Sequence, residues 1–274
     1  MEFLGQLSPS ETFNILSELS HKPNKNLGQN FLIDSNIVRK SLDFAEVCSD
    51  DVVVEVGTGL GTLSGALITR AKYVYAVELD KKLYNYISEK YPHETYANFE
   101  VLNADALDFP FGSMPDSIKD FKIVANLPYA ISTPWMDLAV ERRPSRMSLM
   151  LQKEAAQRFA AKTDKDFCPI SIFVKSAYDI CELYKVSASC FYPKPNVDSA
   201  LLSLSLKQDA FFFKANTKNC IRKIFSQRRK QIGAIAKNIS EEYPNINTWL
   251  ESIDPKLRPE AISIASWQKL NEVL

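Results

Sequence analysis

Residues 52–61 have the sequence VVVEVGTGLG, in which four valines and a glutamate precede three glycines at every second position. β-Branched residues favour a strand, and glycines let the backbone turn tightly and approach a ligand closely. The spacing differs from the Gly-x-Gly-x-x-Gly of dinucleotide-binding sheets. The stretch predicts a strand, a nucleotide-binding turn at Gly57 and a following helix, and a tight turn without a ligand is the alternative.

Short apolar runs alternate with helix-like segments from residue 50 to about residue 206. This alternation predicts an α/β fold with a mostly parallel, doubly wound sheet, whose ligands bind at the carboxyl ends of the strands. Two later apolar runs, 170–178 and 199–206, are predicted as an antiparallel pair of strands that closes the sheet. The other predicted strands are 52–56, 73–77, 99–102, 121–125 and 147–151, and the predicted helices are 60–70, 81–90, 133–142 and 153–161.

The pattern changes after residue 207. Apolar residues recur at helical spacing from Cys220 to Ile239, with Arg222, Arg229 and Lys230 on another face. We therefore predict a small helical domain over 208–274. The whole chain is neutral, with 33 basic and 33 acidic residues, but residues 207–274 hold 12 basic against 7 acidic ones. This asymmetry indicates an anionic partner for the C-terminal part, and a solvated helical surface is the alternative.

The composition excludes several classes of protein. No apolar run approaches the length of a membrane span, and the polar N-terminus does not resemble a secretory signal. The 5 cysteines are scattered and the chain has 2 histidines, which argues against a disulfide framework or a metal site and favours a cytoplasmic protein. Residues 1–23 are predicted to form a loosely attached extension.

Acidic residues end two successive predicted strands. Glu78 follows Gly57 by 21 residues, where a carboxylate can accept both hydroxyls of a ribose. Asp105 ends the next strand and can accept from the amino group of an adenine, although a helix N-cap is the simpler interpretation of this residue alone. NAD and S-adenosylmethionine both carry an adenosine, so these two residues leave the cofactor open.

The fourth strand ends in Asn126-Leu127-Pro128-Tyr129. A hydride-transfer enzyme needs a general acid or base near the nicotinamide, and none stands here, which disfavours a dehydrogenase. An amide that donates and accepts hydrogen bonds, followed by a proline that restricts the backbone and an aromatic ring, suits a flat, hydrogen-bonding ligand.

Asn126-Leu127-Pro128-Tyr129 behind EVGTGLG resembles the S-adenosylmethionine-dependent adenine-N6 methyltransferases. Four further stretches resemble signatures of the KsgA family of ribosomal RNA adenine dimethyltransferases, and together the resemblance spans roughly 24–274. These stretches are NLGQNFL at 26–32, FYPKPNVDSA at 191–200, FSQRRK at 225–230 and LRPE at 257–260.

The resemblance implies a Rossmann-like class I S-adenosylmethionine methyltransferase sheet over 24–207 and an RNA-binding helical domain over 208–274. It also implies roles for single residues in the cofactor site. Asn30 and Leu32 would contact the methionine end of the cofactor and Gly57 would lie against it. Glu78 would hold the ribose, Asp105 the adenine, and Asn126 would lie between cofactor and target base.

The same resemblance indicates a mechanism by alignment rather than by acid–base chemistry. The Asn126 side-chain oxygen and the Leu127 carbonyl would accept from the adenine amino group, and Pro128 would hold their loop. Tyr129 would stack on a flipped adenine and Phe191 would clamp its other face. Core packing is the alternative for both aromatic residues.

The predicted activity is N6,N6-dimethylation of two adjacent adenosines in the 3′-terminal hairpin of small-subunit (16S) ribosomal RNA. The substrate would be a pre-30S particle, the enzyme a cytoplasmic monomer with a role in small-subunit biogenesis, and Arg222, Arg229 and Lys230 would contact RNA. Two alternatives remain: the sister branch that methylates one adenosine of large-subunit RNA, and a non-catalytic nucleic-acid-binding factor on the same fold.

Overall fold

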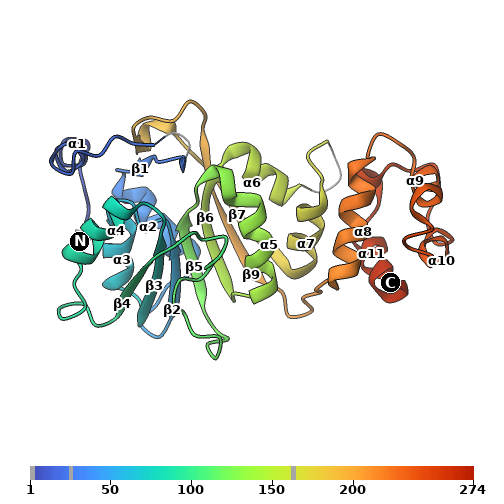
Figure 1. Ribbon diagram of the computed structural model, residues 1–274, viewed down its shortest axis with the longest axis horizontal. Coiled ribbons are helices and arrows are strands. Elements are labelled where there is room, and N and C mark those ends of the chain that lie inside the picture. Colours follow the sequence, from blue (N-terminus) through green and yellow to red (C-terminus); the bar gives the residue numbers. More distant parts are fainter. Residues whose placement is uncertain (1–3, 25–26, 162–164) are drawn as a thin grey trace. The chain divides into compact units, whose positions relative to one another are not determined.

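A computed structural model describes residues 4–24, 27–161 and 165–274 of the chain (Figure 1). The chain forms two compact units. The first unit comprises Met1–Ala156 and Ile180–Leu206, and the second comprises Gln157–Asp179 and Lys207–Leu274. The second unit thus takes in a segment, residues 157–179, that lies ahead of the predicted helical domain in the sequence.

A seven-stranded sheet forms the centre of the fold, in the order β4-β3-β2-β5-β6-β9-β7. β4, β3, β2, β5 and β6 are parallel, and β9 pairs antiparallel with β6. The predicted α/β sheet is confirmed. Its strands are β2 (Val52–Val56), β3 (Tyr73–Glu78), β4 (Phe99–Asn103), β5 (Lys122–Asn126), β6 (Arg146–Gln152), β7 (Tyr178–Val186) and β9 (Ser199–Leu206).

A second, two-stranded sheet pairs β1 (Phe31–Leu32) with β8 (Phe191–Tyr192) antiparallel. This ladder joins two of the signatures singled out in the sequence, which lie about 160 residues apart, as the register Leu32↔Phe191 shows.

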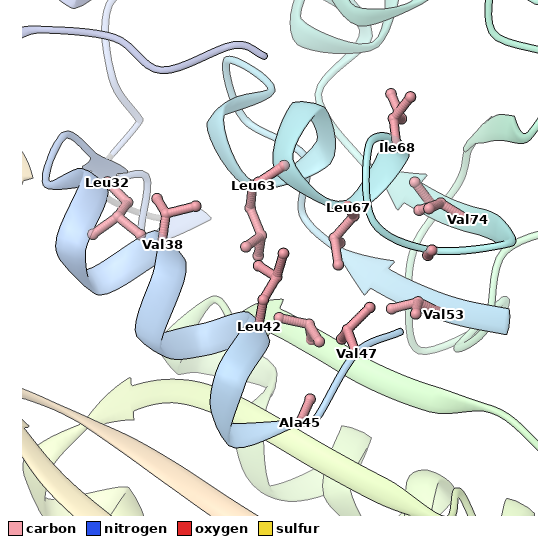
Figure 2. Close-up of a cluster of buried hydrophobic side chains, with 14 of the residues drawn as sticks. Leu32, Val38, Leu42, Ala45, Val47, Val53, Leu63, Leu67, Ile68 and Val74 are labelled. Carbon is pink, nitrogen blue, oxygen red and sulfur yellow. The ribbon is translucent and has the colours of Figure 1, made fainter. Parts of the chain in front are cut away.

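Helices α2 (Ser35–Phe44) and α3 (Thr62–Ile68) contribute the apolar side chains that bury one part of the sheet. Figure 2 shows Val38 and Leu42 of α2 close to Leu63 and Leu67 of α3, with Val53 of β2 beside them. Burying each large aliphatic side chain contributes about 1.5–3 kcal/mol. This packing sets the start of α3, and with it the glycine turn that precedes α3, against the sheet.

The remaining helices of the first unit are α1 (Pro9–Glu18), α4 (Lys81–Lys90) and α5 (Ser132–Arg142), and α6 (Lys153–Ala160) spans the change from the first unit to the second. The second unit contains α7 (Pro169–Ala177), α8 (Ala215–Ser226), α9 (Ile232–Ile239), α10 (Ile246–Leu250) and α11 (Ile264–Val273). No helix among the described residues is long and apolar enough to cross a membrane.

The predicted strand at 170–178 is wrong, because this segment is helix α7. Pro169 occupies the first turn, where its fixed φ favours a helix, and Ser171 Oγ accepts from the backbone N–H of Cys168 at 3.1 Å. Nearly every residue of α7 is buried, and a short apolar run that is buried on all sides has no periodicity that separates helix from strand. The strand beside β9 is instead β7, which is exposed over most of its length.

The predicted helical run from Cys220 to Ile239 is interrupted. α8 ends at Ser226 and α9 begins at Ile232. The first N–H groups of α9 are bonded by another segment, since Ile232 N donates to the Leu257 carbonyl at 2.7 Å and Gly233 N to the Pro255 carbonyl at 3.0 Å. A periodic sequence gives no sign of this break, because the carbonyls that start the second helix come from residues much later in the chain.

The described part of residues 1–23 is not loosely attached, contrary to the prediction. Ser8 and Glu11 form a reciprocal cap at the start of α1. Leu7 and Leu16 are buried in a cluster with Phe31, Leu60 and Leu83. The N-terminal segment therefore packs against the elements that carry the glycine turn and α4.

Candidate cofactor and target-base site

A cavity opens at the carboxyl ends of β2, β3, β4 and β5. Every cofactor residue predicted from the sequence lines this cavity, and so do three of the predicted catalytic residues that follow Asn126. The predicted residues that line it are Asn30, Leu32, Gly57, Glu78, Asp105, Asn126, Leu127, Pro128 and Tyr129.

The glycine turn between β2 and α3 forms one wall of the cavity. Gly57 and Gly61 adopt φ values of +77° and +79°, which residues that have a Cβ atom rarely adopt. Gly57 N donates to the Val77 carbonyl of β3 at 2.9 Å. On the outer side, Lys90 Nζ donates to the Leu60 carbonyl at 2.9 Å and Tyr91 Oη to the Gly61 carbonyl at 3.1 Å. The turn is thus held on both sides.

Glu78 lies at the end of β3 with 6% of its surface exposed. Its Oε2 accepts from Gly59 N at 3.0 Å and from Thr58 Oγ1 at 3.2 Å, and its Oε1 accepts from Asp80 N at 2.9 Å. Burial raises the pKa of Glu78, and these three hydrogen bonds act against that rise. A carboxylate has about four acceptor positions, so Glu78 retains acceptor capacity toward the cavity.

Asp105 follows β4 and is half-buried. Its Oδ1 accepts from Leu107 N at 2.8 Å within a turn, and the helix N-cap interpretation is wrong, because no helix lies between β4 and β5. The side chain also lines the cavity. This turn contact uses one carboxylate oxygen, so the second oxygen of Asp105 remains available to a ligand.

Asn126 ends β5 and contacts a segment far away in the sequence. Its Nδ2 donates to the Asn30 carbonyl at 3.1 Å, across a separation of 96 residues. This contact directs the amide nitrogen to the 27–32 segment, so the oxygen is the atom of this amide that can accept from a ligand. Leu127 N donates to the Met150 carbonyl of β6 at 3.1 Å, which fixes the loop that follows.

Tyr129 follows Pro128 in a single 3₁₀ turn, residues 129–131. Its hydroxyl lies 2.9 Å from the Ser199 hydroxyl at the start of β9. Burial raises the pKa of Tyr129, against the effect of the Ser199 contact. The phenol is therefore a neutral, fixed ring at neutral pH, and its side chain lines the cavity.

Phe191 is placed differently from the other predicted residues. Only 3% of it is exposed, and it belongs to the apolar core around α2 and α3. It pairs with Leu32 across the β1–β8 ladder and is not among the residues that line the cavity. A clamp on the target base by Phe191 stays a prediction, and it requires this ring to leave the core.

The predicted RNA contacts lie in the second unit. Arg222 is on α8, where its guanidinium donates to Asn219 Oδ1 at 3.0 Å. Arg229 and Lys230 are exposed in the segment between α8 and α9. They do not share one helical face, contrary to the prediction, because the helix ends before them.

Known proteins resemble this chain over almost its whole length. Residues 20–274 match the family described as "Ribosomal RNA adenine dimethylase". The chain belongs to this family. Proteins named "Ribosomal RNA small subunit methyltransferase A" are 44% identical in Opitutus terrae and 34% identical in Clostridium botulinum, each covering 96% of this chain and 98% of the relative.

Solved structures share the fold. A dimethyladenosine transferase from Plasmodium falciparum is 27% identical, with a TM-score of 0.72 over 88% of this chain and 95% of its own. The 23S rRNA methyltransferase ErmE is 24% identical, with a TM-score of 0.66 over 89% of this chain and 99% of its own, which supports the fold alone. As a member of the dimethylase family, this chain is a ribosomal RNA adenine dimethyltransferase that uses S-adenosylmethionine, as the sequence predicted.

The residues of the cavity fit this methyl donor. Glu78 retains acceptor capacity for ribose hydroxyls, and the open backbone at Gly57 admits close approach, since an added Cβ there would meet its nearest atom at 3.7 Å. Among the described residues, no group of three or more His, Cys, Asp or Glu side chains could hold a metal ion. The site of this dimethylase therefore offers acceptors and apolar walls.

Sequence reasoning missed several residues of this site. Glu55 lines the cavity and is fully buried, and interactions with the side chain and backbone of Ser64 act to lower the pKa of its carboxyl. Burial raises the pKa of Glu55 to about 8. Gln29, which also lines the cavity, donates to Asp80 Oδ2 at 2.9 Å. Gln29 belongs to the NLGQNFL signature and Glu55 to the EVGTGLG motif. Nothing in the sequence indicates which residues these two side chains would contact.

Proposed function

We propose that this dimethylase methylates N6 of two adjacent adenosines near the 3′ end of small-subunit ribosomal RNA, within an assembling small subunit. The observation that carries the proposal is the contact between the Asn126 amide and the Asn30 carbonyl at 3.1 Å, which leaves the Asn126 oxygen for the target amino group. The names of the 44% and 34% identical relatives support the choice of the small subunit.

The chemistry assigns the protein a positioning task. The N6 lone pair of adenine is delocalised into the ring and is a poor nucleophile. When bound, S-adenosylmethionine supplies a methyl group on a positively charged sulfur, which is already a strong electrophile. The Asn126 oxygen and the Leu127 carbonyl accept from the amino group and favour a tetrahedral nitrogen, whose lone pair then points to the methyl group.

Further residues hold the two reactants in this proposal. Tyr129 stacks on the extruded adenine while its hydroxyl stays hydrogen-bonded to Ser199, and Pro128 restricts the loop that carries Leu127 and Tyr129. Glu78 accepts from the ribose of the cofactor, and Asp105 accepts from its adenine amino group. Asn30 and Leu32 contact the methionine end, and Gly57 lies against it.

The helical second unit provides the sequence-independent part of RNA binding in this proposal. Arg222, Arg229 and Lys230 contact phosphates, in a C-terminal part that carries 12 basic and 7 acidic residues. The enzyme acts as a monomer on the particle, in the cytoplasm where ribosomal subunits are assembled.

Methyl transfer from labelled S-adenosylmethionine tests the proposal. The substrates are small subunits from an under-methylated strain and, separately, naked large-subunit RNA, and nuclease digestion maps the label. We expect N6,N6-dimethyladenosine as a pair near the small-subunit 3′ end. Label only in large-subunit RNA would assign the chain to the sister activity, and no label with cofactor still bound would indicate a binding factor.

A further inference from the structure

Gln29 lies where three parts of the first unit meet. Its Oε1 accepts from Asn24 N at 2.7 Å and lies 2.9 Å from His21 Nε2, and its Nε2 donates to Asp80 Oδ2 at 2.9 Å. The orientation of the amide follows from these partners, because the opposite orientation would place an NH₂ group against the Asn24 N–H and an oxygen against a carboxylate. His21 must then carry a proton on Nε2 and donate it to Gln29.

The partners of Gln29 are sheltered from water. The side chains of His21 and Asp80 are 6% and 16% exposed. Burial raises the pKa of Asp80, but the hydrogen bonds from Gln29 and from the first N–H groups of α4 outweigh it, so the pKa is lowered overall. Hydrogen bonds to an ionised carboxylate are stronger than those between neutral groups, so the contact with Asp80 holds Gln29 in the position where it bonds residues 21–24.

The contacts of Gln29 continue to both sides of the cavity. On one side, Asp80 N donates to Glu78 Oε1 at 2.9 Å. On the other side, the next residue in the chain, Asn30, accepts from Asn126 Nδ2 through its carbonyl at 3.1 Å. Glu78, assigned to the ribose, is therefore linked to Gln29 through Asp80 alone. Asn126, assigned to the target amino group, is linked to Gln29 through Asn30 alone.

We propose that Gln29, held by His21, is a positioning residue. It fixes the cofactor side of the cavity, formed by the glycine turn and Glu78, relative to the target-base side, formed by Asn126 and Tyr129. It acts through Asp80 on Glu78 and through Asn30 on Asn126. The inference rests on the roles proposed above for Glu78 and Asn126. It also gives the N-terminal segment a function, since residues 21–24 hold the amide that sets this geometry.

The experiment compares Gln29→Ala and His21→Ala with wild type in three measurements: the Kd of S-adenosylmethionine, kcat on under-methylated small subunits, and Tm. Loss of one hydrogen bond corresponds to a change of about three- to tenfold, and we expect this change in both Kd and kcat. His93→Ala is the matched control, because His93 is exposed and is the other histidine of the chain.

His21→Gln separates the donor from the ring. A glutamine places an N–H donor near the position of Nε2, so this variant is expected to regain most of the Kd and kcat that His21→Ala loses. In ¹⁵N NMR spectra of the wild type, we expect His21 to carry a slowly exchanging proton on Nε2. This proton should exchange faster in Gln29→Ala.

Clear results would overturn the inference. If Gln29→Ala and His21→Ala lower Tm while Kd and kcat stay at the wild-type values, the network only attaches the N-terminal segment. A His21→Gln variant as impaired as His21→Ala would remove the donor role. Glu78→Gln and Asn126→Ala serve as reference: if they also leave Kd and kcat unchanged, the proposed function fails, whereas a defect in these two alone overturns only the role of Gln29.

Discussion

The two sides of the cavity are held by different kinds of contact. On the cofactor side, Glu78 accepts from the glycine turn and from Asp80 N, and the turn is bonded to Val77 of β3 and to the side chains of Lys90 and Tyr91, which follow it along the chain. On the target-base side, Asn126 and Tyr129 are held by partners 96 and 70 residues away in the sequence. The cofactor side is thus built from adjacent elements, and the target-base side depends on how distant segments come together.

The largest expected effect concerns the buried carboxyl at the base of the cofactor side. Burial raises the pKa of Glu55 from 4.5 to about 8. An acid whose pKa is higher in the folded state stabilises the fold below its unfolded pKa and loses this contribution as pH rises toward the folded value. Each pKa unit corresponds to about 1.4 kcal/mol, so the apoprotein should lose several kcal/mol of stability between about pH 4.5 and 8.

Glu55→Gln should remove most of this dependence. Urea unfolding across this pH range measures it, with exposed Glu89→Gln as the control. A Glu55→Gln variant that keeps the wild-type pH dependence would show that the carboxyl is ionised in the folded protein and that the cofactor side is less dry than its burial indicates.

The next prediction distinguishes cofactor binding from methyl transfer, and so tests the two sides of the cavity separately. Asn126→Ala should bind S-adenosylmethionine with nearly the wild-type Kd and transfer methyl groups at least about 100-fold more slowly, since it removes a positioned polar partner of the reacting group. Calorimetry gives the Kd, and single-turnover transfer to small subunits gives the rate. Wild-type turnover in this variant would contradict the proposed mechanism.

The second unit offers a smaller effect that leaves both sides of the cavity intact. Reversal of Arg229 and Lys230 to glutamate should weaken binding to the small subunit and reduce the slope of log K against log salt by about one for each phosphate that the protein no longer neutralises. Binding measured at four salt concentrations tests this. An unchanged slope would return these exposed residues to the solvated-surface interpretation.

The smallest expected effect distinguishes the contribution of the Tyr129 ring from that of its hydroxyl group. Tyr129→Phe keeps the ring and removes the hydrogen bond with Ser199, which should cost about threefold in kcat. Tyr129→Ala also removes the stacking on the base and should cost about tenfold or more in the KM for RNA. Ser199→Ala is the matched variant and should behave like Tyr129→Phe. Equal values for Phe and Ala at position 129 would remove the stacking role.

The sequence by itself determined the parallel sheet, the glycine turn and the acids at the ends of β3 and β4, because these depend on period, glycine content and position along single elements. It also placed Asn126 at the end of a strand. The same reasoning failed at α7, where an apolar run buried on all sides looked like a strand, and between α8 and α9, where carbonyls of Pro255 and Leu257 start the second helix.

Only the tertiary structure decided which distant segments meet at the cavity. The pairing of Asn126 with Asn30, the burial of Phe191 against α2 and α3, and the contacts of Gln29 with His21 and Asp80 all join parts of the chain that no local pattern connects. The physical reason is that a hydrogen bond between distant residues depends on the packing of every element between them, whereas a strand or a turn depends on its own few residues.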